Sequence, residues 1–261
     1  MPPAAFSLEG KVAVVTGGNS GIGKAIAVML AQAGGTVVIA GRRLEASETV
    51  AGEIVAGGGK ASALPLDVTS AEQIAGLVQR VLKDRGRIDV LVNNAGGPAG
   101  AGFAPGNILD ISEADWDNTL QTNLKSVFRM SRAVGRVMLS AKQGSIVNVA
   151  SVFAQYPFPG LAAYSAAKAA IVNFTKACAG EWAPHVRVNA VAPSLIMTPV
   201  IERKYTPRMY EQRIAEIPMG RIGRPEDVAG AVLYLASDAA AWVTGTVIEM
   251  GGGDRLYRPY K

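Results

Sequence analysis

The sequence predicts a doubly wound α/β fold, with about seven parallel strands and helices on both faces of the sheet. Short runs rich in Val, Ile, Leu and Ala alternate with amphipathic stretches along the whole chain, as in successive βαβ units. Most of the runs are apolar throughout rather than alternating, as expected for strands that helices cover on both faces. A glycine-rich turn directly follows the first run, which is where such folds bind phosphate.

Each predicted strand is a short apolar run bounded by turn residues. The strands are expected at Val12–Thr16, Thr36–Ala40, Ala61–Leu66, Val90–Asn93, Ser145–Val149, Arg187–Val191 and Val247–Met250. Helices are expected between them, at Ile22–Ala33, Leu44–Ala56, Ala71–Arg85, Glu113–Ser140, Ala162–Trp182 and Pro225–Ser237. The last helix begins with Pro225 in its first turn, followed by acids that suit the positive end of the helix dipole.

Two glycine- and proline-containing stretches, Gly96–Gly106 and Pro193–Gly220, are expected to be loops. Both follow predicted strands, so both should lie at the carboxyl edge of the sheet, where ligands bind in open α/β folds. The stretch 193–220 is the expected substrate loop. The methionines of this stretch, of which Met197 is the first, either adapt to an apolar substrate or lie at a subunit contact.

Length and composition favour one domain over residues 1–261, with a core of about 8–253. The chain has 261 residues, of which 49% are hydrophobic and 18% charged, and shows no repeat, linker or compositional break. The single cysteine, Cys178, cannot form an internal disulfide, and with one histidine, His185, it leaves no Cys/His zinc cluster. We therefore expect no metal site, a structural His185 and a buried, inert Cys178.

The net charge of +5 raises the possibility of a nucleic-acid partner, but the residue pattern argues against it. Lys and Arg never run beyond two in a row, and aromatic residues make up only 6% of the chain. No apolar run reaches the roughly 18 residues of a membrane span, and the first residues do not resemble a secretory signal. The expectation is a cytoplasmic protein that binds neither nucleic acid nor membrane.

The turn after the first strand has glycines where a dinucleotide-binding turn needs them. Gly17 allows a tight turn, Gly21 lets the backbone approach a pyrophosphate, and Gly23 allows close helix packing. Asn19, Ser20 and Ile22 complete the expected phosphate-binding turn. The alternative is an ordinary glycine-rich connection between a strand and a helix.

The end of the second strand favours NADP(H) over NAD(H). An acid there would hydrogen-bond the adenine ribose of NAD, whereas Gly41 has no side chain and Arg42 offers a guanidinium to a 2′-phosphate. Ser20 adds no second cation, so the preference is expected to be moderate, with NAD(H) also usable. Alternatively, Arg42 and Arg43 only form the solvated start of the next helix. Asp67, after the third strand, either faces the adenine amino group or caps a helix.

Three residues after the fifth strand suggest acid/base chemistry. Ser151 follows that strand, and Tyr164 and Lys168 stand four residues apart on a predicted helix, hence on one face. A tyrosine acts as an acid or base near neutral pH only if positive charge lowers its pKa from about 10. Lys168, helped by an oxidised nicotinamide ring, is expected to supply that charge. Without the other motifs, such a pair would be a solvated helix face.

The motifs occur in an order that resembles the short-chain dehydrogenase/reductase family. They are Thr16–Gly23, Asn93-Asn94-Ala95-Gly96, Asn123, Ser151, Tyr164 with Lys168, Arg187–Pro193 and Gly220–Asp227. The resemblance extends from about Leu8 to Gly253. It implies a Rossmann fold, NAD(P)-dependent oxidoreductase activity and a homotetramer. The implied interfaces are the long helices after the fourth and fifth strands and the C-terminal region.

The resemblance also implies roles for individual residues. Tyr164 would be the general acid in carbonyl reduction, Lys168 would lower its pKa and hold the nicotinamide ribose, and Ser151 would hydrogen-bond the substrate oxygen. Asn123 would bind a water that links Lys168 to a proton relay. The implied coenzyme contacts further include Val68, Asn94, Ala95, Gly96, Pro193, Ile196 and Thr198. The family usually has glycine where this chain has Ser194, so a side chain there is expected to shift the loop that carries Ile196 and Thr198.

These expectations amount to an NADP(H)-dependent oxidoreductase that transfers hydride between nicotinamide and a carbonyl or secondary alcohol. The substrate remains open among a 3-oxoacyl thioester, an alicyclic ketone and a polyol. The run Phe153–Phe158, with Tyr156 inside it, either lines an apolar substrate pocket or is a packing loop. Alternatives are an enoyl- or dienoyl-thioester reductase and a nucleotide-binding regulator with vestigial activity. The tail Asp254–Lys261 either reaches a neighbouring subunit or frays.

Overall fold

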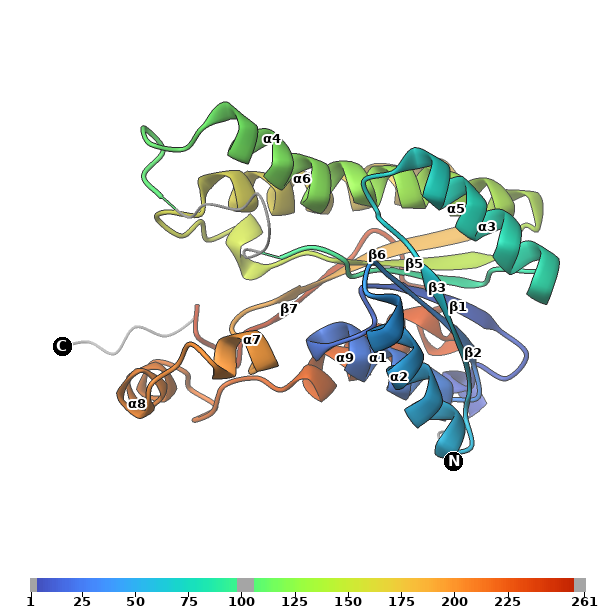
Figure 1. Ribbon diagram of the computed structural model, residues 1–261, viewed down its shortest axis with the longest axis horizontal. Coiled ribbons are helices and arrows are strands. Elements are labelled where there is room, and N and C mark those ends of the chain that lie inside the picture. The colour runs from blue at the N-terminus through green and yellow to red at the C-terminus, as the bar shows by residue number, and fades with distance from the viewer. Residues whose placement is uncertain (1–3, 98–105, 256–261) are drawn as a thin grey trace.

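The computed structural model describes residues 4–97 and 106–255, and in this part of the chain seven strands form one parallel sheet (Figure 1). The strands are β1 Val12–Thr16, β2 Thr36–Gly41, β3 Lys60–Pro65, β4 Val90–Asn93, β5 Gly144–Val149, β6 Val186–Pro193 and β7 Val247–Met250. Their order is β3-β2-β1-β4-β5-β6-β7. The order reverses between β1 and β4, and such a switch point opens a crevice at the carboxyl ends of the strands. The predicted fold class is confirmed.

Helices cover both faces of the sheet. Figure 1 shows α1 Gly21–Gln32, α2 Leu44–Ala56 and α9 Pro225–Ala236 on one face, and α3 Ala71–Arg85, α5 Ser126–Ser140 and α6 Ala162–Trp182 on the other. Two buried clusters fill these layers, one with Ile26 of α1 and Val232 of α9, the other with Leu77 of α3 and Met138 of α5. Helices on both faces explain why the strands are continuous apolar runs. The predicted helix bounds agree to within a residue, except for one helix.

The predicted helix Glu113–Ser140 is interrupted. It consists of α4 Glu113–Leu120, a π-helical turn at Gln121–Lys125 and then α5. The predicted ends at Glu113 and Ser140 are confirmed. The π turn between them was not predicted, because an apolar periodicity does not register the one extra residue that such a turn inserts. Asn123 lies on this turn and is 2% exposed.

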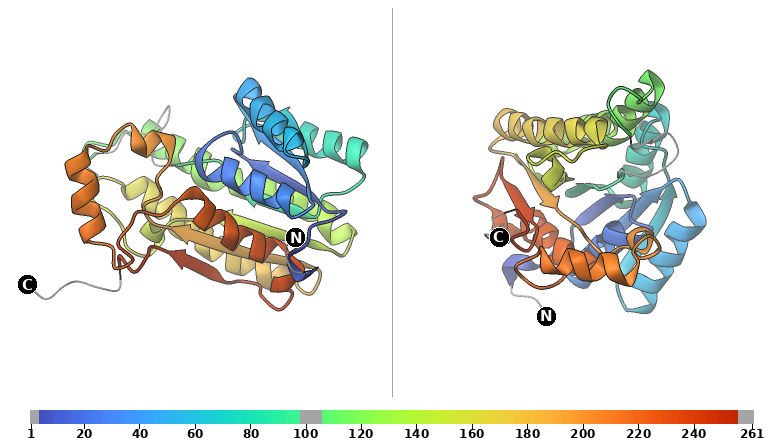
Figure 2. Two further views of the ribbon diagram at one scale, coloured as in Figure 1. Left: turned by 90° about the horizontal axis from the view of Figure 1, so that it is seen from below. Right: turned by 90° about the vertical axis from the view of Figure 1, so that its left-hand side faces the viewer.

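The stretch 193–220 contains two short helices, α7 Pro199–Glu202 and α8 Pro207–Ala215, where a loop was expected. Each begins with proline in its first turn, and the Thr206 hydroxyl accepts a hydrogen bond from the Met209 amide at 3.3 Å. Figure 2 shows α8 beyond the end of the sheet, on the side where the carboxyl ends of the strands lie. Most of the predicted loop 96–106 lies outside the described residues, as does most of the tail 254–261.

Three short 3₁₀ segments, at Ala4–Phe6, Val152–Ala154 and Asp238–Ala240, complete the structure. Cys178 is buried in α6, as expected, and burial raises the pKa of its thiol to about 11, so the thiol stays protonated at neutral pH. Among the described helices none is both long enough and apolar enough to cross a membrane.

Candidate active site

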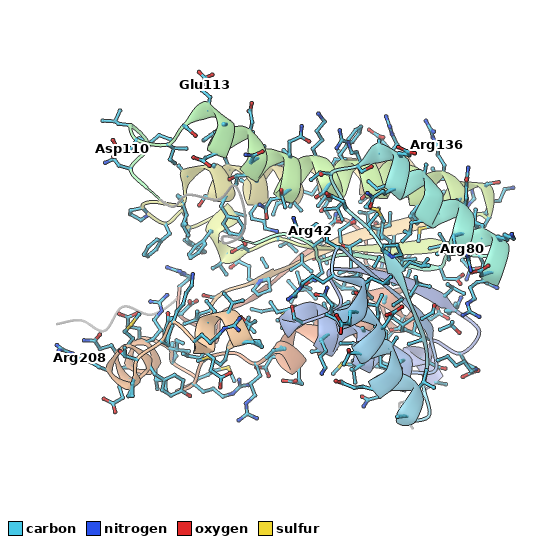
Figure 3. The ribbon with its side chains drawn as sticks, viewed as in Figure 1. Arg42, Arg80, Asp110, Glu113, Arg136 and Arg208 are labelled. Atoms are coloured by element: carbon cyan, nitrogen blue, oxygen red, sulfur yellow. The ribbon has the colours of Figure 1, made fainter. Side chains whose placement is uncertain are left out.

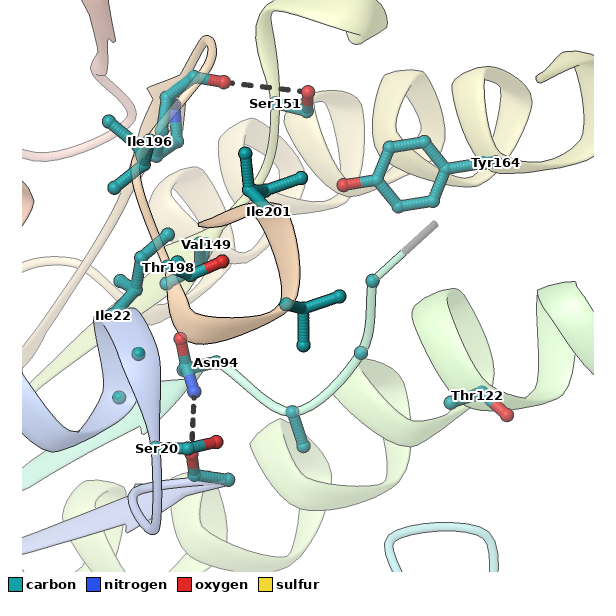
Figure 4. A pocket seen from close by; sticks show the side chains of 18 of the residues that line it. Ser20, Ile22, Asn94, Thr122, Val149, Ser151, Tyr164, Ile196, Thr198 and Ile201 are labelled. Carbon is teal, nitrogen blue, oxygen red and sulfur yellow. Dashed lines mark hydrogen bonds between the residues drawn. The ribbon is translucent and has the colours of Figure 1, made fainter. Parts of the chain in front are cut away.

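A cavity of about 1370 Å³ opens at the carboxyl edge of the sheet (Figure 4). Nearly all the site residues expected from the sequence line it: Gly17, Asn19, Ser20, Gly21, Ile22, Gly23, Arg42, Arg43, Asp67, Val68, Asn94, Ala95, Gly96, Ser151, Phe153, Tyr164, Lys168, Pro193, Ile196 and Thr198. Asn123 and Tyr156 are expected site residues that the lining does not include. One cavity therefore joins the glycine turn to the Ser, Tyr and Lys side chains.

The glycine turn has the shape that a dinucleotide phosphate requires. Gly17 and Gly21 have φ angles of +66° and +51°, which favour glycine. A Cβ on Gly23 would stand 2.2 Å from the carbonyl oxygen of Gly17, so only glycine fits where α1 packs on the turn. The first amides of α1 then face the cavity without a side chain between them and an anion. The residues present fit the pyrophosphate of a dinucleotide.

The side chains of Thr16 and Asn94 hold the turn in this shape. The Thr16 hydroxyl accepts hydrogen bonds from the amides of Asn94 at 3.0 Å and Ala95 at 3.1 Å and donates to Val92 at 3.2 Å. The Asn94 amide group donates to the carbonyl oxygens of Thr16 at 2.9 Å and Gly17 at 3.1 Å. Asn94 was expected beside the coenzyme ribose, and its side chain braces the phosphate turn. Sequence reasoning missed Thr16, whose position at the end of β1 was the available signal.

Two positively charged residues, Arg42 and Arg43, lie beside the glycine turn. Arg42 is exposed, and Arg43 donates to the side-chain oxygens of Asn19 at 3.2 Å and Ser20 at 3.4 Å. The expectation that the turn has no second cation is incomplete, because Arg43, the residue just before α2, reaches it. Hydrogen bonds from Thr69 lower the pKa of Asp67, and nearby Arg42 lowers it further.

Asp67 does not cap a helix. Its carboxylate accepts hydrogen bonds from the Thr69 amide at 2.8 Å and the Thr69 hydroxyl at 2.7 Å, within a local turn. The residue that caps α3 is Ser70, whose hydroxyl accepts a hydrogen bond from the Gln73 amide at 3.2 Å. Asp67 still lines the cavity next to Arg42, where its carboxylate faces the same space as the guanidinium.

Ser151 and Tyr164 lie together at the other end of the cavity (Figure 4). The Ser151 hydroxyl accepts a hydrogen bond from the Phe153 amide at 3.2 Å and donates weakly to Pro193 at 3.5 Å. Burial raises the pKa of Tyr164 to about 12, and a hydrogen bond with Ser151 opposes that shift. At neutral pH the phenol therefore keeps its proton. The expected lowering of the Tyr164 pKa by Lys168 together with an oxidised nicotinamide ring stays a prediction.

Lys168 is buried between the sheet and Tyr164. Its Nζ donates to the Val149 carbonyl oxygen at 2.7 Å and lies 5.5 Å from the centre of the Tyr164 ring. Burial lowers the pKa of this lysine to about 8. An ammonium has three donors, so those not used on Val149 can reach a ligand in the cavity that Lys168 lines.

Asn123 supports the cavity wall from behind. Its side-chain oxygen accepts a hydrogen bond from the Gly97 amide at 2.8 Å, and its amide group donates to Thr119 at 3.1 Å and Gly97 at 3.3 Å. Two of these bonds hold Gly97, which follows Asn94, Ala95 and Gly96 in the chain. A relay from Asn123 to Lys168 stays a prediction.

Ser194 ties the segment after β6 to the segment after β7. Its amide donates to the Met250 carbonyl oxygen at 2.8 Å, and its hydroxyl hydrogen-bonds the carboxylate of Asp254, a side chain only 5% exposed. Met197 donates to Gly223 at 2.8 Å, so the residues around Ile196 are held from two sides. The glycine-to-serine departure therefore adds an attachment to the loop. Asp254 was not expected, since it is 60 residues from its partner.

Aromatic and aliphatic side chains surround the reactive end. The Phe153 ring lies 5.7 Å from Phe158 and 6.5 Å from Tyr164, and Phe153, Phe158 and Ile201 line the cavity. Tyr156 instead lies against Arg255, with 5.9 Å between the guanidinium carbon and the ring centre. The run Phe153–Phe158 is thus partly pocket wall and partly packing.

In the described part of the chain, no cluster of three His, Cys, Asp or Glu side chains is arranged to hold a metal ion. His185 lies between α6 and β6 and is exposed.

Comparison with known proteins extends over almost the whole chain. A family described as enoyl-(acyl carrier protein) reductase matches residues 17–254. The chain is 43% identical over 247 residues to 3-oxoacyl-[acyl-carrier-protein] reductase FabG of Thermotoga maritima, which covers 94% of this chain and 98% of the relative.

Two solved structures are also similar. A putative NAD(P)-dependent gluconate 5-dehydrogenase from Beutenbergia cavernae with bound NADP has a TM-score of 0.90 and 39% identity, covering 97% of this chain and 100% of that one. A 7α-hydroxysteroid dehydrogenase complexed with NADH and 7-oxo glycochenodeoxycholic acid has a TM-score of 0.90 and 33% identity, covering 95% and 96%.

Proposed function

The chain belongs to the short-chain dehydrogenase/reductase family and is an NAD(P)-dependent oxidoreductase, and we propose that it reduces 3-oxoacyl thioesters with NADPH. The observation that carries this proposal is the continuous cavity, which joins the phosphate turn and Arg42 at one end to Ser151 and Tyr164 at the other. A coenzyme held on the turn and a carbonyl held by Ser151 and Tyr164 would share this space.

The chemistry follows from the protonation states at the reactive end. NADPH supplies the hydride when bound. Ser151 and Tyr164 are the donors for the substrate oxygen, and their hydrogen bonds stabilise the negative charge that develops there. Tyr164, protonated at neutral pH, gives its proton to that oxygen. Lys168 holds the coenzyme ribose and provides positive charge beside the phenolate that remains.

The coenzyme preference rests on charge. Arg42 and Arg43 both line the cavity beside the turn, and the 2′-phosphate of NADP is the group that guanidinium side chains bind best there. Asp67 is engaged by Thr69 and faces Arg42, so it does not replace the ribose-binding acid of an NAD site. We therefore assign NADPH as the preferred coenzyme and NADH as a weaker one.

The thioester is supported by the relative of Thermotoga maritima, whose name specifies a 3-oxoacyl carrier substrate. An enoyl-thioester reductase is the second candidate, since the matching family carries that description. The neighbouring Ser151 and Tyr164 favour reduction of a carbonyl, because both are donors for an oxygen. A regulator without activity is disfavoured, since binding alone does not need a buried tyrosine and lysine side by side.

A substrate panel tests the proposal. NADPH oxidation would be followed with 3-oxoacyl thioesters of increasing chain length, enoyl thioesters, alicyclic ketones and, in the reverse direction with NADP, gluconate. The expected result is turnover of the 3-oxoacyl series with an optimum chain length, and none in the Tyr164→Phe variant, which should still bind NADPH. Turnover of enoyl thioesters alone, or full activity in Tyr164→Phe, would overturn the assignment.

We also propose a homotetramer. Phe128 of α5 is 40% exposed and packs edge-to-face on Phe174 of α6, with 6.3 Å between the ring centres, so an aromatic patch lies on these neighbouring helices. Trp242, close before β7, is 100% exposed. Exposed aromatics at the two expected interfaces support association, and a stable monomer at micromolar concentration in sedimentation would contradict it. The cytoplasmic location stays a prediction, which cell fractionation would check.

A further inference from the structure

The charges that line the cavity are mostly positive, and apart from Lys168 at the reactive end the cations lie in two groups. Arg42 and Arg43 stand at the coenzyme end, while Arg203, Lys204 and Arg213 come from the segment that carries α7 and α8. Within the described lining, the acidic side chain is Asp67, which belongs to the coenzyme end. The second group therefore faces the cavity without an acid opposite it.

Arg203 and Lys204 are both exposed, and within the part of the chain that the structure describes neither side chain has a partner for its charge. Among residues 4–97 and 106–255, no ion pair or side-chain hydrogen bond reaches either cation. Arg213 differs, because its guanidinium pairs with Glu216. Two adjacent, unneutralised cations on the wall of a cavity are suited to an anionic part of a ligand.

The segment that carries these cations begins beside the phosphate turn and then passes the reactive end of the cavity. The segment leaves the phosphate turn at Thr198, whose methyl group would be 3.2 Å from a Cβ on Gly21. Ile201 then lies near Ser151 and Tyr164 (Figure 4). From there the chain runs through Arg203 and Lys204 to α8, which carries Arg208 at the far end of the molecule from α2 (Figures 1 and 3).

Apolar and aromatic side chains line the cavity together with these cations. Phe158, Val200 and Tyr205 line the same cavity, and Phe158 and Val200 are among the exposed large hydrophobic residues. A ligand that reaches from Tyr164 past these residues to Arg203 and Lys204 would therefore combine an apolar or amide-containing arm with an anionic end.

We propose that Arg203 and Lys204 bind the phosphate of a phosphopantetheine arm that carries the thioester. The guanidinium offers paired donors to the phosphate oxygens, and the ammonium adds a point charge. The arm joins an acyl thioester at one end to a phosphate at the other, which matches a cavity with a proton donor inside and cations at its outer wall. This assignment rests on the proposed reduction of thioesters and identifies the carrier group that the enzyme recognises.

Two substrates that differ only in the phosphate test this assignment. A 3-oxoacyl phosphopantetheine and the same 3-oxoacyl pantetheine would be compared by kcat/KM with saturating NADPH. Wild type should favour the phosphorylated substrate by about tenfold, mainly through KM, and added salt should reduce that preference. The double variant Arg203→Gln/Lys204→Gln should lose most of the preference and keep its kcat on the pantetheine substrate.

Arg208→Gln is the matched control, because Arg208 is an exposed cation of the same segment outside the cavity lining. It should keep the preference, and thermal unfolding should show that all variants fold. Equal kcat/KM for the two substrates in wild type would overturn the phosphate assignment and leave the proposed function intact. A weaker NADPH Kd in the double variant, with an unchanged preference, would assign the cations to the coenzyme and likewise overturn it. Turnover of ketones but of no thioester would refute the proposed function itself.

Discussion

Replacing Gly23 by alanine should disturb the phosphate turn more than the rest of the fold. The added Cβ would stand 2.2 Å from the Gly17 carbonyl oxygen and 2.4 Å from the Asn94 side-chain nitrogen. The first contact is with backbone, so rotation of a side chain cannot relieve it. Either α1 must move away from β1, or the turn must open and release Asn94.

Overpacking of this kind costs about 1–3 kcal/mol, and a 2.2 Å contact with backbone places Gly23→Ala near the upper end of that range. Because the same movement displaces the amides that face the cavity, NADPH affinity should also fall, by about tenfold or more. Urea unfolding would measure the free energy of unfolding, and NADPH fluorescence titration would measure the Kd.

Gly76→Ala is the matched control. Gly76 lies inside α3, and a Cβ there would meet nothing within 4 Å. Alanine is the better helix former, so this variant should gain about 0.5–1 kcal/mol of stability and keep its NADPH affinity. If Gly23→Ala unfolds at the wild-type urea concentration and binds NADPH normally, the turn does not have the tight packing described above.

Three further predictions concern single side chains. Arg42→Ala should weaken NADPH binding by about 1–2 kcal/mol and leave NADH unchanged, and equal losses by calorimetry for both coenzymes would contradict a 2′-phosphate contact. Burial lowers the pKa of Lys168 from 10.5 to about 8. Between these two pH values the folded state therefore binds fewer protons than the unfolded state. The free energy of unfolding should for this reason rise as pH rises through that window. Lys168→Met, without that charge to bury, should therefore show a smaller rise than wild type in urea unfolding between pH 8 and pH 10, and the same slope would refute the buried charge. Ser194→Gly leaves the Asp254 carboxylate without its hydrogen bond, so we expect a loss of about 1–3 kcal/mol of stability and weaker coenzyme binding, whereas an unchanged unfolding curve would mean that the attachment contributes nothing.

The sheet was predictable because its strands are local apolar runs. The bounds of β1, β4 and β7 agree with those expected, and where β6 is longer, its ends at Val186 and Pro193 are set by pairing with β5 and β7. Pairing partners lie far away in the chain, so such ends are not visible in a local pattern. A different reason explains why α7 and α8 were missed: their prolines suggested a loop, although proline is also common in the first turn of a helix.

The candidate site, like the fold, was predictable from the sequence only in part. Residue types and spacing placed Ser151, Tyr164 and Lys168 together, because one helix and one strand end position all three side chains. The rise in the Tyr164 pKa could not be predicted from the sequence, because the burial that causes it depends on the surrounding packing. The contact of Ser194 with Asp254 joins two loops through tertiary structure, and no sequence spacing indicates it.

The way in which the segment 198–216 is attached affects how the specificity of this protein can evolve. Among the described residues, its hydrogen bonds and ion pairs are internal apart from one with the neighbouring Ile217. Hydrogen bonds to more distant parts of the protein occur just outside it, at Met197 and Met219. Insertions, deletions or replacements that keep Thr198, which lies beside Gly21 of the phosphate turn, would leave the sheet and that turn intact. New specificities could therefore arise by exchange of this segment alone, with the hydride chemistry inherited unchanged.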